Sequence, residues 1–126
     1  MSADRRRSLG ALGERAAAEH LLRRGYEILE RNFRTRSGEL DLVARGNGCL
    51  VFCEVKTRVG RAADSPLGPF AAVGPRKRAQ LRRMAGQWLH ARSPGYGAPH
   101  SRFDVIGVTV AAGGGVLSLE HLENAF

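Results

Sequence analysis

The chain has 126 residues, of which 43% are hydrophobic and 25% are charged. This length is too short for two domains, so we expect residues 1–126 to form one domain with a modest core, with residues 1–7 as a flexible basic tail. Lys and Arg number 20 against 12 Asp and Glu, giving a formal net charge of +8. That balance favours a polyanionic partner, nucleic acid or an anionic membrane surface, although basicity alone is weak evidence.

Cysteine spacing and the lack of long apolar stretches bear on location. Cys49 and Cys53 fall in one predicted strand, about 13 Å apart at ~3.3 Å per residue, which is too far for a disulfide. No apolar stretch of signal-peptide length follows residues 1–7, and no run is long enough to cross a bilayer. We therefore expect a cytoplasmic protein without a membrane partner, with a homodimer as one candidate assembly.

The first predicted helix runs from a cap at Ser8 to about Arg24, with Gly25 as its stop signal. Its apolar side chains fall in one arc of the helical wheel: Ala11, Ala17, Ala18, Leu21 and Leu22. Glu14 lies near the middle of that arc, which predicts an inward-pointing carboxylate. The alternative is an acid near a helix N-terminus that only complements the helix dipole.

Residues 26–34 are predicted as a first strand, and residues 38–56 as a β-hairpin. Asn47 and Gly48 form the dipeptide favoured by a two-residue type I′ turn, so Gly46 should face Cys49. Counting back along the ladder places Asp41 opposite Glu54, and Glu39 opposite Lys56. Directly opposed residues share a face, so this hairpin is predicted to gather three acids and a lysine on one side of the sheet.

Two opposed carboxylates destabilise a sheet unless a positive charge lies between them. Leu50 and Phe52 share the charged face, which argues against a simply solvated hairpin and predicts that another element covers this face. Mg²⁺ is usually held by one or two carboxylates plus water and phosphate oxygens. We therefore expect Asp41 and Glu54 to bind Mg²⁺ or Mn²⁺, with Glu14 as a further ligand.

Residues 58–74 are rich in Gly, Pro and Ala and are predicted to form a loop beside this site, either substrate-contacting or a linker. Pro75 then opens a second helix whose core-facing stripe comprises Leu81, Met84, Ala85, Trp88 and Leu89. Its first turn carries Arg76, Lys77 and Arg78, where the helix dipole is already positive. Such a turn either binds a phosphate or is a solvated basic turn.

The remaining chain is predicted as a loop at residues 93–101, a strand at 103–110, a turn at 113–115 and a last strand at 116–122. Asp104 begins a buried strand and is expected to be structural, held by nearby backbone or an arginine. The order αβββαββ indicates an α/β or α+β fold, with a mixed central sheet flanked by helices. No histidine is spaced for a zinc site, and no glycine-rich phosphate loop is present.

The acid in the first helix, Asp41, and the run Glu54-Val55-Lys56 resemble the pattern of PD-(D/E)XK nucleases, which include Holliday-junction resolvases. The segments 38–44 and 51–58, with Lys77 and the late run 102–105, are similar to the YraN family of uncharacterised bacterial proteins. This resemblance implies a restriction-endonuclease-like fold in a cytoplasmic bacterial protein. Leu40 replaces the proline of the superfamily name, and Cys53 a more usual valine; neither removes a charge from the site.

Together these features favour a metal-dependent endonuclease that hydrolyses phosphodiester bonds in DNA, with branched or flapped DNA among the candidate substrates. Asp41, Glu54 and Glu14 would bind the metal, and Lys56 would orient or help deprotonate a water. The expected DNA-binding residues are Arg58, Arg76, Lys77 and Arg78. The alternative is a nucleic-acid-binding or adaptor module that keeps the nuclease-like fold but does not cut.

Overall fold

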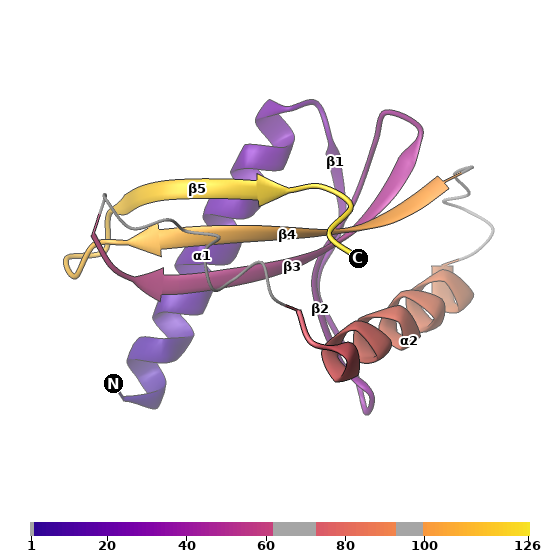
Figure 1. Ribbon diagram of the computed structural model, residues 1–126, viewed down its shortest axis with the longest axis horizontal. Helices are drawn as coiled ribbons and strands as arrows, with labels where there is room; N and C mark the ends of the chain where they lie inside the picture. Colours follow the sequence, from indigo (N-terminus) through magenta and orange to yellow (C-terminus); the bar gives the residue numbers. More distant parts are fainter. Residues whose placement is uncertain (1, 62–72, 93–99) are drawn as a thin grey trace.

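The computed structural model describes residues 2–61, 73–92 and 100–126 and shows an α+β fold (Figure 1). The predicted order αβββαββ is confirmed. The elements are α1 (Ala3–Arg23), β1 (Glu27–Thr35), β2 (Gly38–Gly46), β3 (Cys49–Val59), α2 (Pro75–Arg92), β4 (His100–Val110) and β5 (Val116–Leu122).

The five strands form one sheet in the order β1-β2-β3-β4-β5. Strands β3 and β4 pair in parallel and the other neighbours are antiparallel, so the sheet is mixed as expected. The predicted hairpin register is confirmed from Gly46 opposite Cys49 to Leu42 opposite Cys53. The turn residues Asn47 and Gly48 have φ of 52° and 74°, the left-handed values that a type I′ turn needs.

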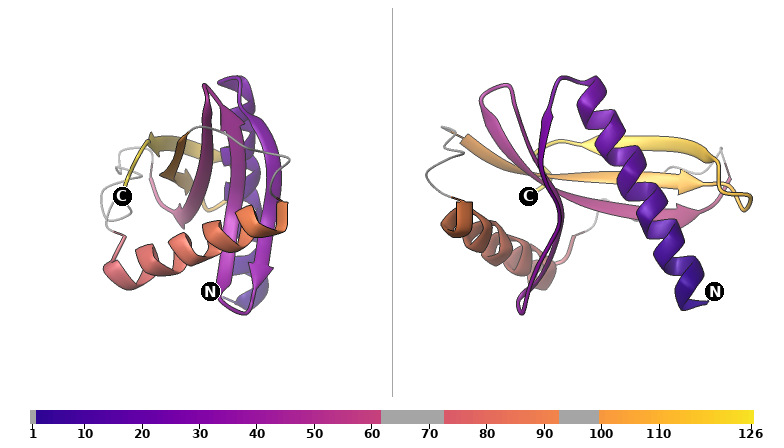
Figure 2. Two further views of the ribbon diagram at one scale, coloured as in Figure 1. Left: turned by 90° about the vertical axis from the view of Figure 1, so that its right-hand side faces the viewer. Right: turned by 180° about the vertical axis from the view of Figure 1, so that it is seen from behind.

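The two helices cover opposite faces of the sheet, which Figure 2 shows from the side and from behind. Under α1 the core includes Ala17, Leu21 and Leu42. Under α2, Leu50 and Phe52 pack with a set that includes Leu81, Met84 and Trp88. The face that carries Leu50 and Phe52 is therefore covered by another element, as the sequence predicted.

The first helix begins earlier than predicted. It starts at Ala3, and the Ser2 hydroxyl caps it by accepting a hydrogen bond from the N–H of Arg5 at 3.2 Å. Residues 3–7 thus form the first turns of the helix and not the flexible tail that the sequence predicts. The helix ends near the expected place, because Gly25 adopts φ of 88° directly after the capping residue Arg24.

The buried face of α1 also differs from the predicted arc. Its fully buried residues are Gly13, Ala17, Ala18 and Leu21. Ala11 is exposed and Leu22 is 50% exposed. Glu14 therefore lies at the edge of the interface, partly buried, and its carboxylate borders the core.

Several strand ends differ from the prediction. Strand β3 continues to Val59, so Arg58 belongs to the strand and not to a loop. Strand β4 starts at His100, because its parallel ladder with β3 extends to Cys49 opposite His100. The remaining parts of the two predicted loops, residues 62–72 and 93–99, lie outside the described residues.

Two further observations bear on location. Cys49 and Cys53 are both free thiols. Neither helix in the described part of the chain is long and apolar enough to cross a membrane.

Candidate metal centre

The site forms where strands β2 and β3 separate. Their ladder ends at Leu42 opposite Cys53. One residue further, Oδ2 of Asp41 accepts a hydrogen bond from the backbone N–H of Val55 at 2.8 Å. In a ladder that continued, this N–H would donate to a backbone carbonyl. Here it donates to the Asp41 side chain, and this hydrogen bond holds Asp41 at the point where the strands separate.

Three carboxylates meet at this point. One oxygen each of Glu14, Glu39 and Asp41 lies within 4.8 Å of the other two. Glu14 comes from α1, while Glu39 and Asp41 alternate along β2. Such a spacing brings all-oxygen donors close enough to share one hard cation.

Glu39 is a candidate ligand that the sequence pattern alone does not single out. The sequence placed it opposite Lys56, but β2 turns toward β1 beyond the hairpin ladder. Arg34 pairs with Glu39 in the register, and its Nε lies 3.2 Å from Oε2. The signal in the sequence was the period of two, which puts Glu39 and Asp41 on the same face of one strand.

The approach of α1 to the sheet depends on Gly13. A Cβ atom at this position would overlap the side chain of Thr57 on β3. The residue directly before Glu14 therefore needs to be glycine for the helix backbone to come this close. This contact sets how near the Glu14 carboxylate lies to the acids of β2.

Glu54 lies beside the three-acid cluster but is not a member of it. Its side chain is 12% exposed, and Nζ of Lys77 lies 3.7 Å from Oε1. Lys56, two residues along the same strand, also attracts the Glu54 carboxylate. The predicted pairing of Asp41 opposite Glu54 on one face is therefore wrong, because the ladder ends one pair earlier. The two carboxylates still influence each other, but Asp41 lies with Glu14 of α1 and Glu54 with Lys77 of α2.

The electrostatics of the site disfavour ionised acids in the absence of a cation. Burial, followed by the charge of Glu54, raises the pKa of Asp41 to about 8 against the opposing hydrogen bond from Val55. Burial likewise raises the pKa of Glu14 and the pKa of Glu54 above their usual range, although Lys77 and Lys56 oppose the shift at Glu54. A bound cation would reverse this balance and favour the ionised forms.

The cluster opens into a surface groove between α1 and the β1–β2 hairpin. Its lining residues are Arg7, Ser8, Gly10, Ala11, Glu14, Asn32, Arg34, Glu39 and Asp41. An adjoining hollow is lined by Ala11, Glu14, Arg15, Arg31, Asn32 and Leu42. Arginines therefore stand on both walls, two from α1 and two from β1, with the carboxylates between them.

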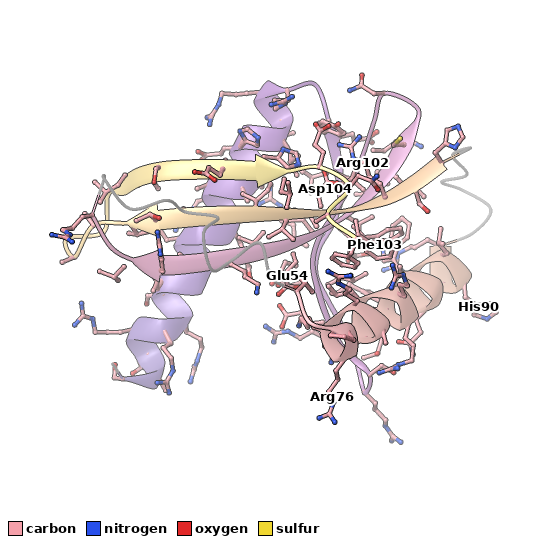
Figure 3. All side chains as sticks on the ribbon, in the orientation of Figure 1. Glu54, Arg76, His90, Arg102, Phe103 and Asp104 are labelled. Carbon is pink, nitrogen blue, oxygen red and sulfur yellow. The ribbon has the colours of Figure 1, made fainter. Side chains whose placement is uncertain are left out.

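The predicted DNA-binding residues are less clustered than expected. In Figure 3 the side chain of Arg76 extends outward from the start of α2. Lys77 contacts Glu54, whereas Nε of Arg78 donates to the carbonyl of Val73 at 2.6 Å. Arg58 lies on β3, where its Nε donates to Thr109 Oγ1 at 3.4 Å. Of the three cations in the first turn of α2, Lys77 alone is shown in contact with a site carboxylate.

Asp104 is structural, as predicted. It is fully buried and binds Arg102 at 2.9 Å, His121 at 2.7 Å and the N–H of Asn124 at 2.9 Å. Burial would raise the pKa of Asp104, but these hydrogen bonds outweigh it and hold the pKa below its usual range. The network ties the end of β5 to β4, on the far side of β3 from β2.

Fold and site together define a small α+β protein with a carboxylate cluster at the divergence of a β-hairpin. The chain belongs to the uncharacterised protein family UPF0102, whose profile matches residues 13–108. It is 50% identical over 120 residues to a UPF0102 protein of Parafrankia sp., covering 94% of this chain and 95% of the relative. It is also 50% identical over 103 residues to one of Kineococcus radiotolerans (82% and 81%) and 44% identical over 124 residues to one of Pelotomaculum thermopropionicum (98% and 99%).

Proposed function

We propose that this protein is a metal-dependent nuclease of the PD-(D/E)XK type that hydrolyses phosphodiester bonds in DNA. The observation that carries the proposal is the meeting of Glu14, Glu39 and Asp41 within 4.8 Å of one another. Glu54 and Lys56 follow on the neighbouring strand β3, in the order that the resemblance to this nuclease pattern leads us to expect. The mixed sheet with a helix on each face is consistent with a restriction-endonuclease-like arrangement.

The donor set fits Mg²⁺ or Mn²⁺. Both ions prefer oxygen ligands, and the cluster offers carboxylate oxygens alone. Asp41 is mostly buried and, among the described residues, its one hydrogen bond comes from the N–H of Val55. A largely buried carboxylate kept beside Glu14, Glu39 and Glu54 is costly unless a cation compensates it. We therefore assign Asp41, Glu14 and Glu39 as ligands, with Glu54 as a further ligand on the α2 side.

Other residues near the cluster would orient the water and bind the phosphate. Bound at the cluster, the ion would lower the pKa of a water and offset charge on the phosphate. Lys56 shares a face with Glu54 and can orient a water or contact a phosphate oxygen. Lys77, 3.7 Å from Glu54, opposes the rise in the pKa of that carboxylate that burial causes. Arg58 continues the same face of β3 and adds a positive charge for a phosphate.

The groove supports a nucleic-acid partner. A chain of net charge +8 attracts polyanions, yet three acids at the floor of the groove would repel a phosphate. Arg7 and Arg15 on α1, with Arg31 and Arg34 on β1, flank those acids and can bind the neighbouring phosphates. The free thiols fit a reducing compartment, and we propose a cytoplasmic location.

The decisive experiment is a cleavage panel with a matched variant. The purified protein would be incubated with Mg²⁺ or Mn²⁺ and single-stranded, duplex, flapped and four-way DNA, and with RNA. We expect metal-dependent cutting that Asp41→Asn and Lys56→Ala abolish, whereas Asp4→Asn, an exposed carboxylate at the start of α1, leaves it unchanged. If the wild type cut no substrate more than Asp41→Asn does, the proposal that the protein is an enzyme would be rejected.

One observation favours a second candidate, a nucleic-acid-binding or adaptor module that does not cut. Lys77 already neutralises part of the charge at Glu54, as a lysine can do in a site that has lost its metal. Calorimetric titration with Mn²⁺ separates the two candidates. Tight DNA binding without Asp41-dependent Mn²⁺ binding would favour the adaptor.

A further inference from the structure

A single asparagine in β1 has a backbone conformation that strands do not normally adopt. Asn32 has φ of 53°, in the left-handed region. Two other asparagines share it, but Asn47 lies in the hairpin turn and Asn124 in the turn after β5. Asn32 is inside β1, between Arg31 opposite Leu42 and Phe33 opposite Leu40, and thus at the register position of Asp41.

This conformation has no packing explanation. Left-handed backbone costs a non-glycine residue about 1 kcal/mol or more, least for asparagine. The cost is usually tolerated where core packing or function requires it. Asn32 is exposed, so its side chain does not fill the core.

The side chain instead lies beside the carboxylate cluster. Burial raises the pKa of Glu14 and hydrogen bonding by the Asn32 amide lowers it, which puts this amide within reach of the Glu14 carboxylate. Asn32 also lines both hollows that meet at Glu14. It therefore lies beside Glu14, the proposed ligand from α1, at the strand position next to Asp41.

We propose that Asn32 is a positioning residue of the metal centre. This proposal rests on the function proposed above. Its amide holds the Glu14 carboxylate in the orientation needed to bind the cation together with Asp41 and Glu39. The left-handed backbone is what places the amide there. Partners that orient a metal ligand typically change metal affinity by 10- to 100-fold when removed.

Substitution of Asn32 by glycine separates the effect of the side-chain amide from the effect of the backbone conformation. Asn32→Gly keeps the left-handed conformation without strain and removes the amide alone. Asn47→Gly is the matched control, because it has nearly the same φ but lies at the hairpin turn. We expect Asn32→Gly to weaken Mn²⁺ binding by about tenfold in calorimetric titration while its melting temperature is unchanged or higher. Asn47→Gly should bind Mn²⁺ as the wild type does.

A double-mutant cycle tests whether Asn32 acts through Glu14. In a Glu14→Gln background, Asn32→Gly should cause no further loss of Mn²⁺ affinity. An equal loss in both backgrounds, or wild-type affinity in Asn32→Gly alongside loss in Asp41→Asn, would overturn the role of Asn32 and leave the metal centre intact. Mn²⁺ binding that is unaffected by Asp41→Asn would reject the metal centre itself, and with it this role.

Discussion

Asp41→Asn should remove most of the pH dependence of stability that the metal-free protein shows between pH 5 and 8. The folded-state pKa of Asp41 is raised to about 8, against about 3.9 in an unfolded chain. Between these values the folded state holds the proton more tightly than the unfolded state does. The free energy of unfolding of the wild type therefore falls as the pH rises through this window.

The size of the effect follows from that interval. A difference of one bound proton changes the free energy of unfolding by about 1.4 kcal/mol per pH unit, so the ceiling between pH 5 and 8 is about 4 kcal/mol. Titration of the neighbouring acids and screening reduce this to about 2 kcal/mol. An asparagine oxygen can still accept the Val55 N–H, so the hydrogen bond at 2.8 Å is kept.

The assay is urea unfolding followed by circular dichroism at four pH values, in the presence of a chelator. Wild type and Asp41→Asn should have similar stability at pH 5, and the variant should be more stable at pH 8. Asp4→Asn, whose carboxylate is 93% exposed, should keep the wild-type slope. If the free energy of unfolding depended on pH in the same way for wild type and Asp41→Asn, the raised pKa of Asp41 would be refuted. Mg²⁺ added at pH 8 should stabilise the wild type more than the variant.

Three further predictions concern packing, the buried acid and binding. Gly13→Ala should destabilise the protein by about 1–3 kcal/mol in urea unfolding, because its Cβ would overlap Thr57. Gly10→Ala on the same helix meets no atom within 4 Å and should stabilise by up to about 1 kcal/mol; equal effects would show that α1 is not held by close approach. Asp104→Asn should cost about 3–5 kcal/mol at neutral pH by breaking a buried ion pair. Since the folded-state pKa of Asp104 is lowered, the wild-type advantage should shrink as the pH falls below about 4, and a constant difference would contradict this assignment. Replacing Arg15 and Arg31 by alanine in the Asp41→Asn background should reduce the salt dependence of duplex DNA affinity by about 1.8 log units per log unit of salt. The double variant Arg76→Ala, Arg83→Ala, on the outer side of α2, should change this salt dependence less. A larger change in that variant than in the Arg15 and Arg31 variant would place the DNA on α2.

The hairpin was predictable because its register depends on local chemistry. Asn47 and Gly48 fix the turn, and every pair from Gly46 to Leu42 follows from it by counting. The element covering Leu50 and Phe52 was predictable as well. The period of two puts both large apolar side chains on one face of β3, and a solvated face would not carry both. These features need no information from distant parts of the chain.

The misplaced features depend on tertiary contacts. The buried face of α1 is centred nearer Gly13 than Glu14, and a hydrophobic wheel gives no weight to a glycine that permits close approach to Thr57. Glu39 was paired with Lys56 because a regular ladder was assumed, whereas the strands separate after Leu42. Nothing in the sequence marks Asn32, since left-handed backbone within a strand cannot be read from residue type.

The parallel pairing of β3 and β4 has a consequence for the order of folding. Neighbours in the β2–β3 hairpin are separated by a turn of two residues, but β3 meets β4 only across a crossover, with Cys49 beside His100. Closing that long loop costs more chain entropy, so the hairpin should form early and β4 should dock late. Glu14, Glu39, Asp41 and Glu54 all precede the crossover. During synthesis, the complete set of acids would therefore leave the ribosome while the outer edge of β3 still lacks its neighbour.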